Sequence, residues 1–162
     1  MNIEIFKHEG YQGFVTVESL MTNECLNVPN EKGIYLMLKN GVKKEFLTES
    51  EGGHFKGKNP TVDQSVLDNK WINESDIIYI GQAGGGSSGA TLKKRLKQYM
   101  RFGKGEPVGH WGGRYIWQLK DNRNLIVCWR ATPNEDPRLI EKEMIETFES
   151  SYGGKPFANI AG

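Results

Sequence analysis

The chain has 162 residues, of which 37% are hydrophobic and 25% are charged, and its formal net charge is +1. These values are ordinary for a soluble globular domain with a real core, and the small net charge gives no overall sign of a nucleic-acid-binding protein. The two cysteines, Cys25 and Cys128, form no C-x-x-C pair, which excludes a disulfide framework and zinc-finger spacing. Since no secretory pattern or membrane-length apolar run is present, we expect a cytoplasmic protein without a membrane partner.

The first part of the sequence predicts strands separated by loops. Residues 14–20, FVTVESL, form a short alternating segment. Residues 33–47, GIYLMLKNGVKKEFL, contain two strand-like runs joined by Asn40-Gly41. This pair predicts a β-hairpin, because both central positions of a type I′ turn need positive φ. Residues 48–70 are rich in Gly, Asn, Ser and charge, and we expect them to form a long loop or insertion.

The second half of the sequence predicts two strands and two helices. The isoleucine-rich run at residues 76–81 and the apolar run at 124–132 are typical of strands. Apolar side chains recur every three or four residues over 91–102 and again over 137–149, where Pro137 suits a first helical turn, so both segments predict helices. The aromatic-rich segment 109–119 fits either a strand or a helix.

Each of these two predicted helices carries one charged side chain on its apolar side. In the first, Arg95 lies three residues after Leu92, and in the second, Glu141 lies three residues before Met144. Buried charges are costly unless they are paired or used. Two interpretations therefore stand side by side: a structural ion pair between the two side chains, or a polar cleft that both of them line.

A glycine-rich segment follows the strand at 76–81. Gly84, Gly86 and Gly89 fit G-x-G-x-x-G, and residues 84–91 nearly fit the phosphate-binding G-x-x-x-x-G-K-[ST] motif, with Ala90 in place of its lysine. A dinucleotide-binding fold would also need repeated βα units, which the remaining sequence lacks. A nucleotide-binding enzyme that uses this loop is therefore the least favoured interpretation.

Several short motifs, taken in order along the chain, resemble those of the GIY-YIG nuclease family. They are GIY at 33–35, YIG at 79–81, LKKRLKQY at 92–99, LIEKEMI at 139–145 and PFANI at 156–160. The resemblance covers about four fifths of the chain. It departs from the family in one respect, since 43 residues lie between Tyr35 and Tyr79 where the family usually has a short link. Such an insertion, at about residues 40–75, is tolerated because loop-closure entropy grows slowly with length.

The resemblance implies an α/β (α+β) fold with a small central, mainly antiparallel sheet flanked by helices. It divides one compact domain into an N-terminal extension, residues 1–32, and a GIY-YIG-like nuclease domain, residues 33–162. The implied function is that of a metal-dependent endonuclease, which hydrolyses phosphodiester bonds of DNA with one Mg²⁺ or Mn²⁺. The alternative is a module on the same scaffold that binds nucleic acid without cutting it.

The resemblance also implies roles for individual residues. Tyr35 and Tyr79 would flank the scissile phosphate, one phenol assisting deprotonation of the attacking water, while Arg95 would bind phosphate oxygens and Glu141 would hold the metal. Because a free phenol has a pKa of about 10, the phenol role requires nearby cations. Two secondary candidates are His110, as a base, and Tyr99; packing is the alternative for each. The implied DNA contacts are Gly81, Lys93, Lys94, Lys97, Arg114 and Asn159.

Overall fold

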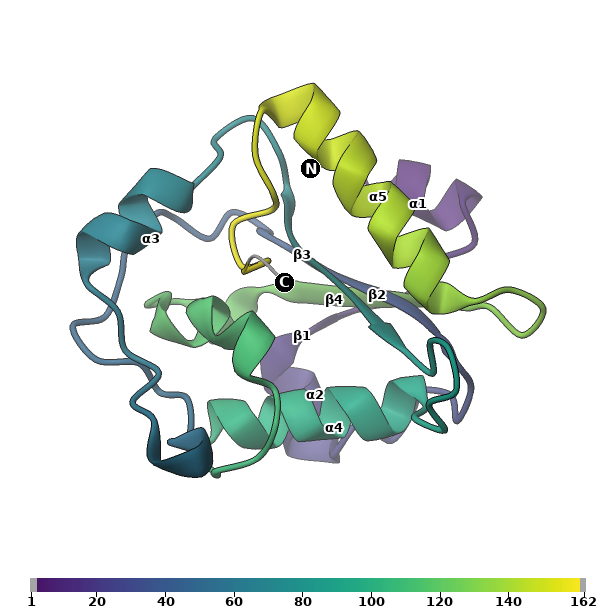
Figure 1. Ribbon diagram of the computed structural model, residues 1–162, viewed down its shortest axis with the longest axis horizontal. Helices are drawn as coiled ribbons and strands as arrows, with labels where there is room; N and C mark the ends of the chain where they lie inside the picture. Colours follow the sequence, from purple (N-terminus) through teal and green to yellow (C-terminus); the bar gives the residue numbers. More distant parts are fainter. Residues whose placement is uncertain (1–2, 161–162) are drawn as a thin grey trace.

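A computed structural model describes residues 3–160 as one four-stranded antiparallel sheet with helices on both faces (Figure 1). The strands are β1 (Gln12–Thr16), β2 (Gly33–Leu38), β3 (Ile77–Ala83) and β4 (Ile126–Ala131), in the spatial order β1-β4-β2-β3. The α-helices are α1 (Glu4–His8), α2 (Val17–Asn23), α3 (Gln64–Lys70), α4 (Leu92–Gly103) and α5 (Pro137–Tyr152). The 3₁₀ helices are η1 (Phe55–Gly57), η2 (Trp111–Gln118) and η3 (Asn122–Asn124). The expected α+β class with an antiparallel sheet is confirmed.

The sheet has a core on each face, because β2 is central and every residue in it is buried. Side chains alternate across a strand, so Tyr35 and Met37 join the larger core, which includes Leu96 of α4. Ile34 and Leu36 join the smaller core, against which α5 packs. The two long helices therefore lie on opposite faces of the sheet and approach one another beside β3 (Figure 1).

The predicted hairpin around Asn40-Gly41 is wrong, although the turn itself is present. Asn40 and Gly41 have φ of +48° and +75°, as such a turn requires. The chain that follows cannot pair with β2, however, because β3 occupies one edge of β2 and β4 occupies the other. Phe46 instead forms an isolated bridge with Leu119. The predicted loop at 48–70 also contains regular structure, namely η1 and the whole of α3.

The N-terminal residues take part in the same sheet. β1 pairs with β4, and the alternating segment ends at Thr16, whose hydroxyl accepts a hydrogen bond from Ser19 N and starts α2. The segment at 109–119 forms η2 rather than a strand. Within the alternating segment, the cap at Thr16 thus ends β1 and starts α2.

Both long helices are confirmed, and their ends have identifiable caps. The hydroxyl of Thr91 accepts a hydrogen bond from Lys94 N at the start of α4. The carboxylate of Asp136 does the same for Arg138 N at the start of α5, which ends at Gly153 with φ of +79°.

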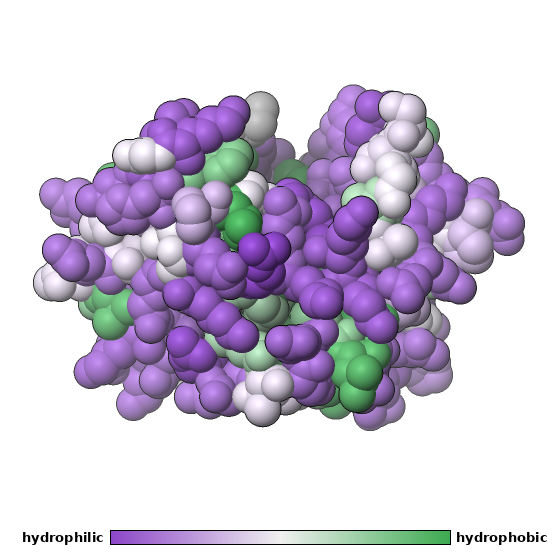
Figure 2. Space-filling model, turned by 90° about the horizontal axis from the view of Figure 1, so that it is seen from below, coloured by the Kyte–Doolittle hydropathy of each residue, from purple (hydrophilic) through white to green (hydrophobic). Residues whose placement is uncertain are grey.

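No helix within residues 3–160 is long and apolar enough to span a membrane. The surface seen from the side of α2 and α4 is mostly hydrophilic and is notched at its upper edge (Figure 2).

The C-terminal segment covers part of the open edge of β3. The side chain of Asn159 accepts a hydrogen bond from Ile80 N and donates one to Ile80 O, both at 2.9 Å. Ala158 N donates to Ile78 O at 2.8 Å. The amide side chain thus replaces a neighbouring strand at this position, and the rest of the edge lies beside the cleft described below.

We expect Asn159→Ala to lower the free energy of unfolding by about 2 kcal/mol, because it leaves both backbone groups of Ile80 unpaired at a covered edge. The Ile80 amide should also exchange faster with solvent in hydrogen-exchange NMR, since its acceptor is lost. Lys155→Ala, in the same segment, is the matched control and should leave that exchange rate unchanged. Equal exchange of the Ile80 amide in both variants would contradict this role for Asn159.

Candidate functional site

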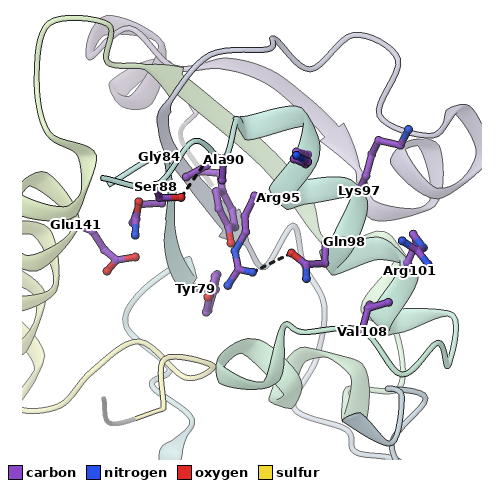
Figure 3. A pocket seen from close by; sticks show the side chains of 14 residues that line it. Tyr79, Gly84, Ser88, Ala90, Arg95, Lys97, Gln98, Arg101, Val108 and Glu141 are labelled. Atoms are coloured by element: carbon purple, nitrogen blue, oxygen red, sulfur yellow. Dashed lines mark hydrogen bonds between the residues drawn. The ribbon is translucent and has the colours of Figure 1, made fainter. Parts of the chain in front are cut away.

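A cleft of about 740 Å³ lies where β3, α4, α5 and the glycine-rich loop meet (Figure 3). Arg95 from α4 and Glu141 from α5 face each other across it, with Tyr79 between them. The cleft is lined by six of the predicted site residues: Tyr35, Tyr79, Lys94, Arg95, Lys97 and Glu141. Residues from four separate motifs, far apart in the sequence, therefore meet in one place.

The cleft is strongly cationic. Its charged lining consists of Lys94, Arg95, Lys97 and Arg101 on one side and the single acid Glu141 on the other. A concave site with this excess of positive charge attracts anions and concentrates a polyanion near its floor. Residues 93–104 contain six Lys and Arg residues and no acid, and four of these cations line the cleft.

Arg95 is oriented by neighbours other than Glu141. One guanidinium nitrogen, Nη1, donates to Gln98 Oε1 and to Gly109 O, both at 3.1 Å. Within residues 3–160, Arg95 forms no ion pair with Glu141 within 4 Å, although its positive charge opposes part of the rise that burial causes in the pKa of that carboxyl. The arrangement corresponds to the second interpretation, a polar cleft lined by both charges. A fixed Nη1 leaves the remaining guanidinium donors available to a ligand.

Glu141 is a half-buried carboxyl without a partner among the described residues, where it makes no hydrogen bond or ion pair. Burial raises its pKa, and the nearby Arg95 only partly opposes this effect. Over the same residues, no group of three or more His, Cys, Asp or Glu side chains could hold a metal ion. A lone carboxylate suits Mg²⁺ or Mn²⁺, which accept water and phosphate oxygens as further ligands, and does not suit a zinc site.

The floor of the cleft is backed by a cluster of buried rings. Tyr35 Oη lies 2.8 Å from His110 Nε2. The His110 ring stacks on Tyr99 with ring centres 3.5 Å apart, and Tyr99 Oη donates to Gly113 O at 2.6 Å. His110 and Tyr99 therefore stand behind Tyr35 and Tyr79 rather than in the cleft itself. The second nitrogen of the imidazole, Nδ1, is buried without a hydrogen-bond partner.

Burial controls the protonation of these rings. It raises the pKa of Tyr79 to about 12 and the pKa of Tyr35 well above its usual range, and Arg95 opposes the shift without overcoming it. Burial, reinforced by the positive charge of Arg95, lowers the pKa of His110 well below 6.5. At neutral pH the phenols are thus protonated and the imidazole is neutral. In the free protein, the positive charge of Arg95 does not lower the pKa of either tyrosine enough to form a phenolate.

Four predicted DNA contacts are absent from the cleft lining. Gly81 packs closely against Tyr35, so that a Cβ at this position would lie 2.6 Å from the tyrosine Oη. Arg114 stacks on the Trp111 ring, 4.5 Å from its centre. Asn159 is bound to β3, as described above. Lys93, although on α4, does not line the cleft.

Three backbone amides of the glycine-rich loop already donate hydrogen bonds to side chains of the protein. Gly85 N donates to Gln82 Oε1 at 2.9 Å, Ala90 N to Ser88 Oγ at 3.2 Å, and Gly86 N to Asp136 Oδ1 at 3.1 Å. A phosphate-binding loop instead presents free amides to an anion. Because a carboxylate already occupies one of these donors, the loop does not support the nucleotide-binding interpretation.

Among the cleft residues that the sequence interpretation did not assign to the site, two polar side chains lie on α4, namely Gln98 and Arg101. Gln98, which orients Arg95, lies three residues after it, so the two side chains share a helix face. Arg101 also lines the cleft, although no motif or periodicity singled it out in the sequence. Helical periodicity counted from Arg95 would have indicated Gln98.

Comparisons with known proteins leave the family open. A scan against protein-family models gave no match, and searches of the curated proteins and of the solved structures found no significant similarity. The resemblance to GIY-YIG nucleases therefore rests on the short ordered sequence motifs, with no support from these comparisons.

Proposed function

We propose that the protein is a GIY-YIG-type endonuclease that hydrolyses DNA phosphodiester bonds with one Mg²⁺ or Mn²⁺. One observation carries the proposal: Tyr35, Tyr79, Arg95 and Glu141, taken from separate motifs, line the same cationic cleft. Each motif alone is weak. Their convergence, together with the cleft's charge, supports a site that binds and cleaves a phosphodiester.

The cations bind the phosphate. Gln98 and the Gly109 carbonyl hold Arg95 by its Nη1, so its other donors can reach non-bridging oxygens without losing much side-chain entropy. Lys94 lines the same wall and adds a second positive charge. Tyr79, protonated at neutral pH, is an O–H donor between the two walls of the cleft.

Glu141 holds the metal ion. Its carboxylate lines the cleft, is half-buried and has no other partner in the described part of the chain, so it fits the role of the one protein ligand. When bound, such an ion polarises the phosphate and stabilises the leaving oxygen. The cleft also leaves space for the waters that Mg²⁺ retains.

His110 accepts the proton of the attacking water by way of Tyr35. Tyr35 Oη takes the proton from water while its own proton passes to His110 Nε2, 2.8 Å away, in the tautomer that carries hydrogen on Nδ1. Arg95 is one cause of the low imidazole pKa. A phosphate bound to Arg95 would offset that repulsion, so substrate binding raises the pKa of His110 and strengthens the base.

The proposal is tested by incubating the protein with supercoiled, branched and single-stranded DNA in Mg²⁺ and in EDTA. We expect Mg²⁺-dependent cleavage, and Arg95→Gln should reduce its rate by about 10²-fold because a phosphate ligand is lost. Arg123→Gln is the matched control, since Arg123 pairs with Glu18 at 3.3 Å outside the cleft. Metal-independent DNA binding without cleavage of any substrate would instead support the non-catalytic binding module.

A further inference from the structure

A line of cationic side chains runs along α4 from the cleft to a second hollow. Lys94, Lys97, Arg101 and Lys104, which we call the α4 cationic track, are spaced by three and four residues and so share one helix face. Lys97 and Arg101 line both the cleft and a hollow of about 320 Å³ between α2 and α4, and Lys104 lines the second hollow. The two hollows are therefore adjacent, with Lys97 and Arg101 bordering both.

The length of the α4 cationic track suits a short stretch of one nucleic-acid strand. Lys104 lies ten positions after Lys94, which corresponds to about 15 Å at the rise of an α-helix. A strand of B-form DNA advances about 3.4 Å per nucleotide along the helix axis and an extended single strand advances further, so the track spans a few nucleotides.

The opposite wall does not offer a matching set of cations. Beyond Tyr79 and Glu141, the cleft meets a third hollow of about 480 Å³, where Glu146 and Glu149 accompany Lys142 and Lys155. In duplex DNA the second backbone lies about 12 Å away or less across a groove. A duplex bound to the track would bring its second backbone toward this wall. There the acids offset the lysines, so the wall offers no net attraction for phosphates. The asymmetry therefore favours a single strand.

One cation of the track is masked by an acid. Arg101 donates from Nε and Nη2 to Glu106 Oε1, at 3.1 and 3.0 Å, and both side chains are exposed. A phosphate must compete with Glu106 for this guanidinium. Lys104 differs, because its Nζ donates to the neutral carbonyl of Met21 at 3.1 Å and forms no ion pair within residues 3–160. Glu106 thus weakens the track at its third position.

We propose that the α4 cationic track binds one strand of single-stranded DNA and leads it to the cleft, with Glu106 limiting the affinity. The inference rests on the proposed function in placing the scissile phosphate in the cleft. It goes further by naming the form of the substrate and the helix face that holds it.

The test measures binding of the full chain to a labelled 12-nucleotide single strand and to the matching blunt duplex, by fluorescence anisotropy in EDTA between 50 and 200 mM NaCl. We expect the single strand to bind more tightly, and Lys97→Gln to reduce the slope of log affinity against log salt by about 0.7, the value for one lost contact. Glu106→Gln should tighten binding and steepen the slope. Lys142→Gln, which removes the same charge from α5, is the matched control and should change neither.

Several results would overturn the track: no binding, duplex binding as tight as single-strand binding, or equal losses in Lys97→Gln and Lys142→Gln. A weaker or unchanged affinity in Glu106→Gln would refute the masking of Arg101. Because the assay contains no metal, it is independent of cleavage. Single-strand binding that depends on Lys97, combined with no cleavage in Mg²⁺, would support the track and refute the proposed nuclease function.

Discussion

Glu141→Gln should reduce Mg²⁺-dependent cleavage by about 10³-fold or more and yet slightly increase thermal stability. The loss in rate follows because Glu141 is the one carboxylate that lines the cleft, and the electrostatic contribution of a catalytic metal amounts to several kcal/mol. A protein that merely needed this side chain for folding would lose stability together with activity. The two measurements therefore separate a functional role from a structural one.

The sign of the stability change follows from the pKa of Glu141, which burial raises above its unfolded value. A group with a raised pKa contributes its full stability below the unfolded pKa and loses it as pH rises. At pH 8 the ionised carboxylate thus costs stability, and Gln removes that cost. The difference in Tm between the variant and the wild type should shrink as pH falls toward 4.

Initial cleavage rates and thermal melts at pH 8 and pH 4 check this prediction. Glu143→Gln is the matched control, because Glu143 is an exposed acid on the same helix and should affect neither measurement. Cleavage at the wild-type rate by Glu141→Gln would show that Glu141 does not hold the metal. A Tm below that of the wild type at pH 8 would contradict the assigned cost of its charge.

Gly81→Ala should lower the free energy of unfolding by about 3 kcal/mol. A Cβ at this position would lie 2.6 Å from both Cε2 and Oη of Tyr35, and overpacking of this kind in a core is costly. The Tyr35 ring cannot move aside easily, because it is buried against Tyr79, Tyr99 and His110. This glycine therefore serves the packing of the aromatic cluster.

Urea denaturation of the single and double variants measures the effect. Gly89→Ala is the control, because a Cβ there meets nothing within 4 Å, and we expect its stability to stay within about 0.5 kcal/mol of the wild type. In a Tyr35→Leu background, which removes the ring, Gly81→Ala should cost much less. The same cost in both backgrounds would place the strain somewhere other than at Tyr35.

The helices and the inward charges were accessible from the sequence because they depend on short-range periodicity. Arg95 and Glu141 each stand out against an apolar stripe within one helical turn, and the structure places both in the cleft. The hairpin at Asn40-Gly41 failed for the opposite reason. The turn is a local property, whereas the neighbours of β2 are β3 and β4, and no local pattern indicates that both edges of a strand are already occupied.

The ordered motifs predicted the principal lining residues, but not their electrostatic state. The pKa values of Tyr79 and His110 depend on how deeply each ring is buried, which follows only from the tertiary packing. Asn159 shows the same limit, since its pairing with Ile80 joins segments that are distant in sequence. The resemblance singled out these residues, and the fold distinguishes those that line the cleft from those that support it.

The interior position of β4 also determines when the sheet can be completed. β2 and β3 can pair once residues 33–83 have been synthesised, whereas β4, which separates β1 from β2, comes from residues 126–131. Until β4 is in place, one edge of the apolar strand β2 has no partner and can pair with another chain. Gln12 must also wait for Trp129, its partner in the register, and closing so long a loop slows folding. The growing chain is therefore most vulnerable to aggregation over the interval between the synthesis of β3 and that of β4.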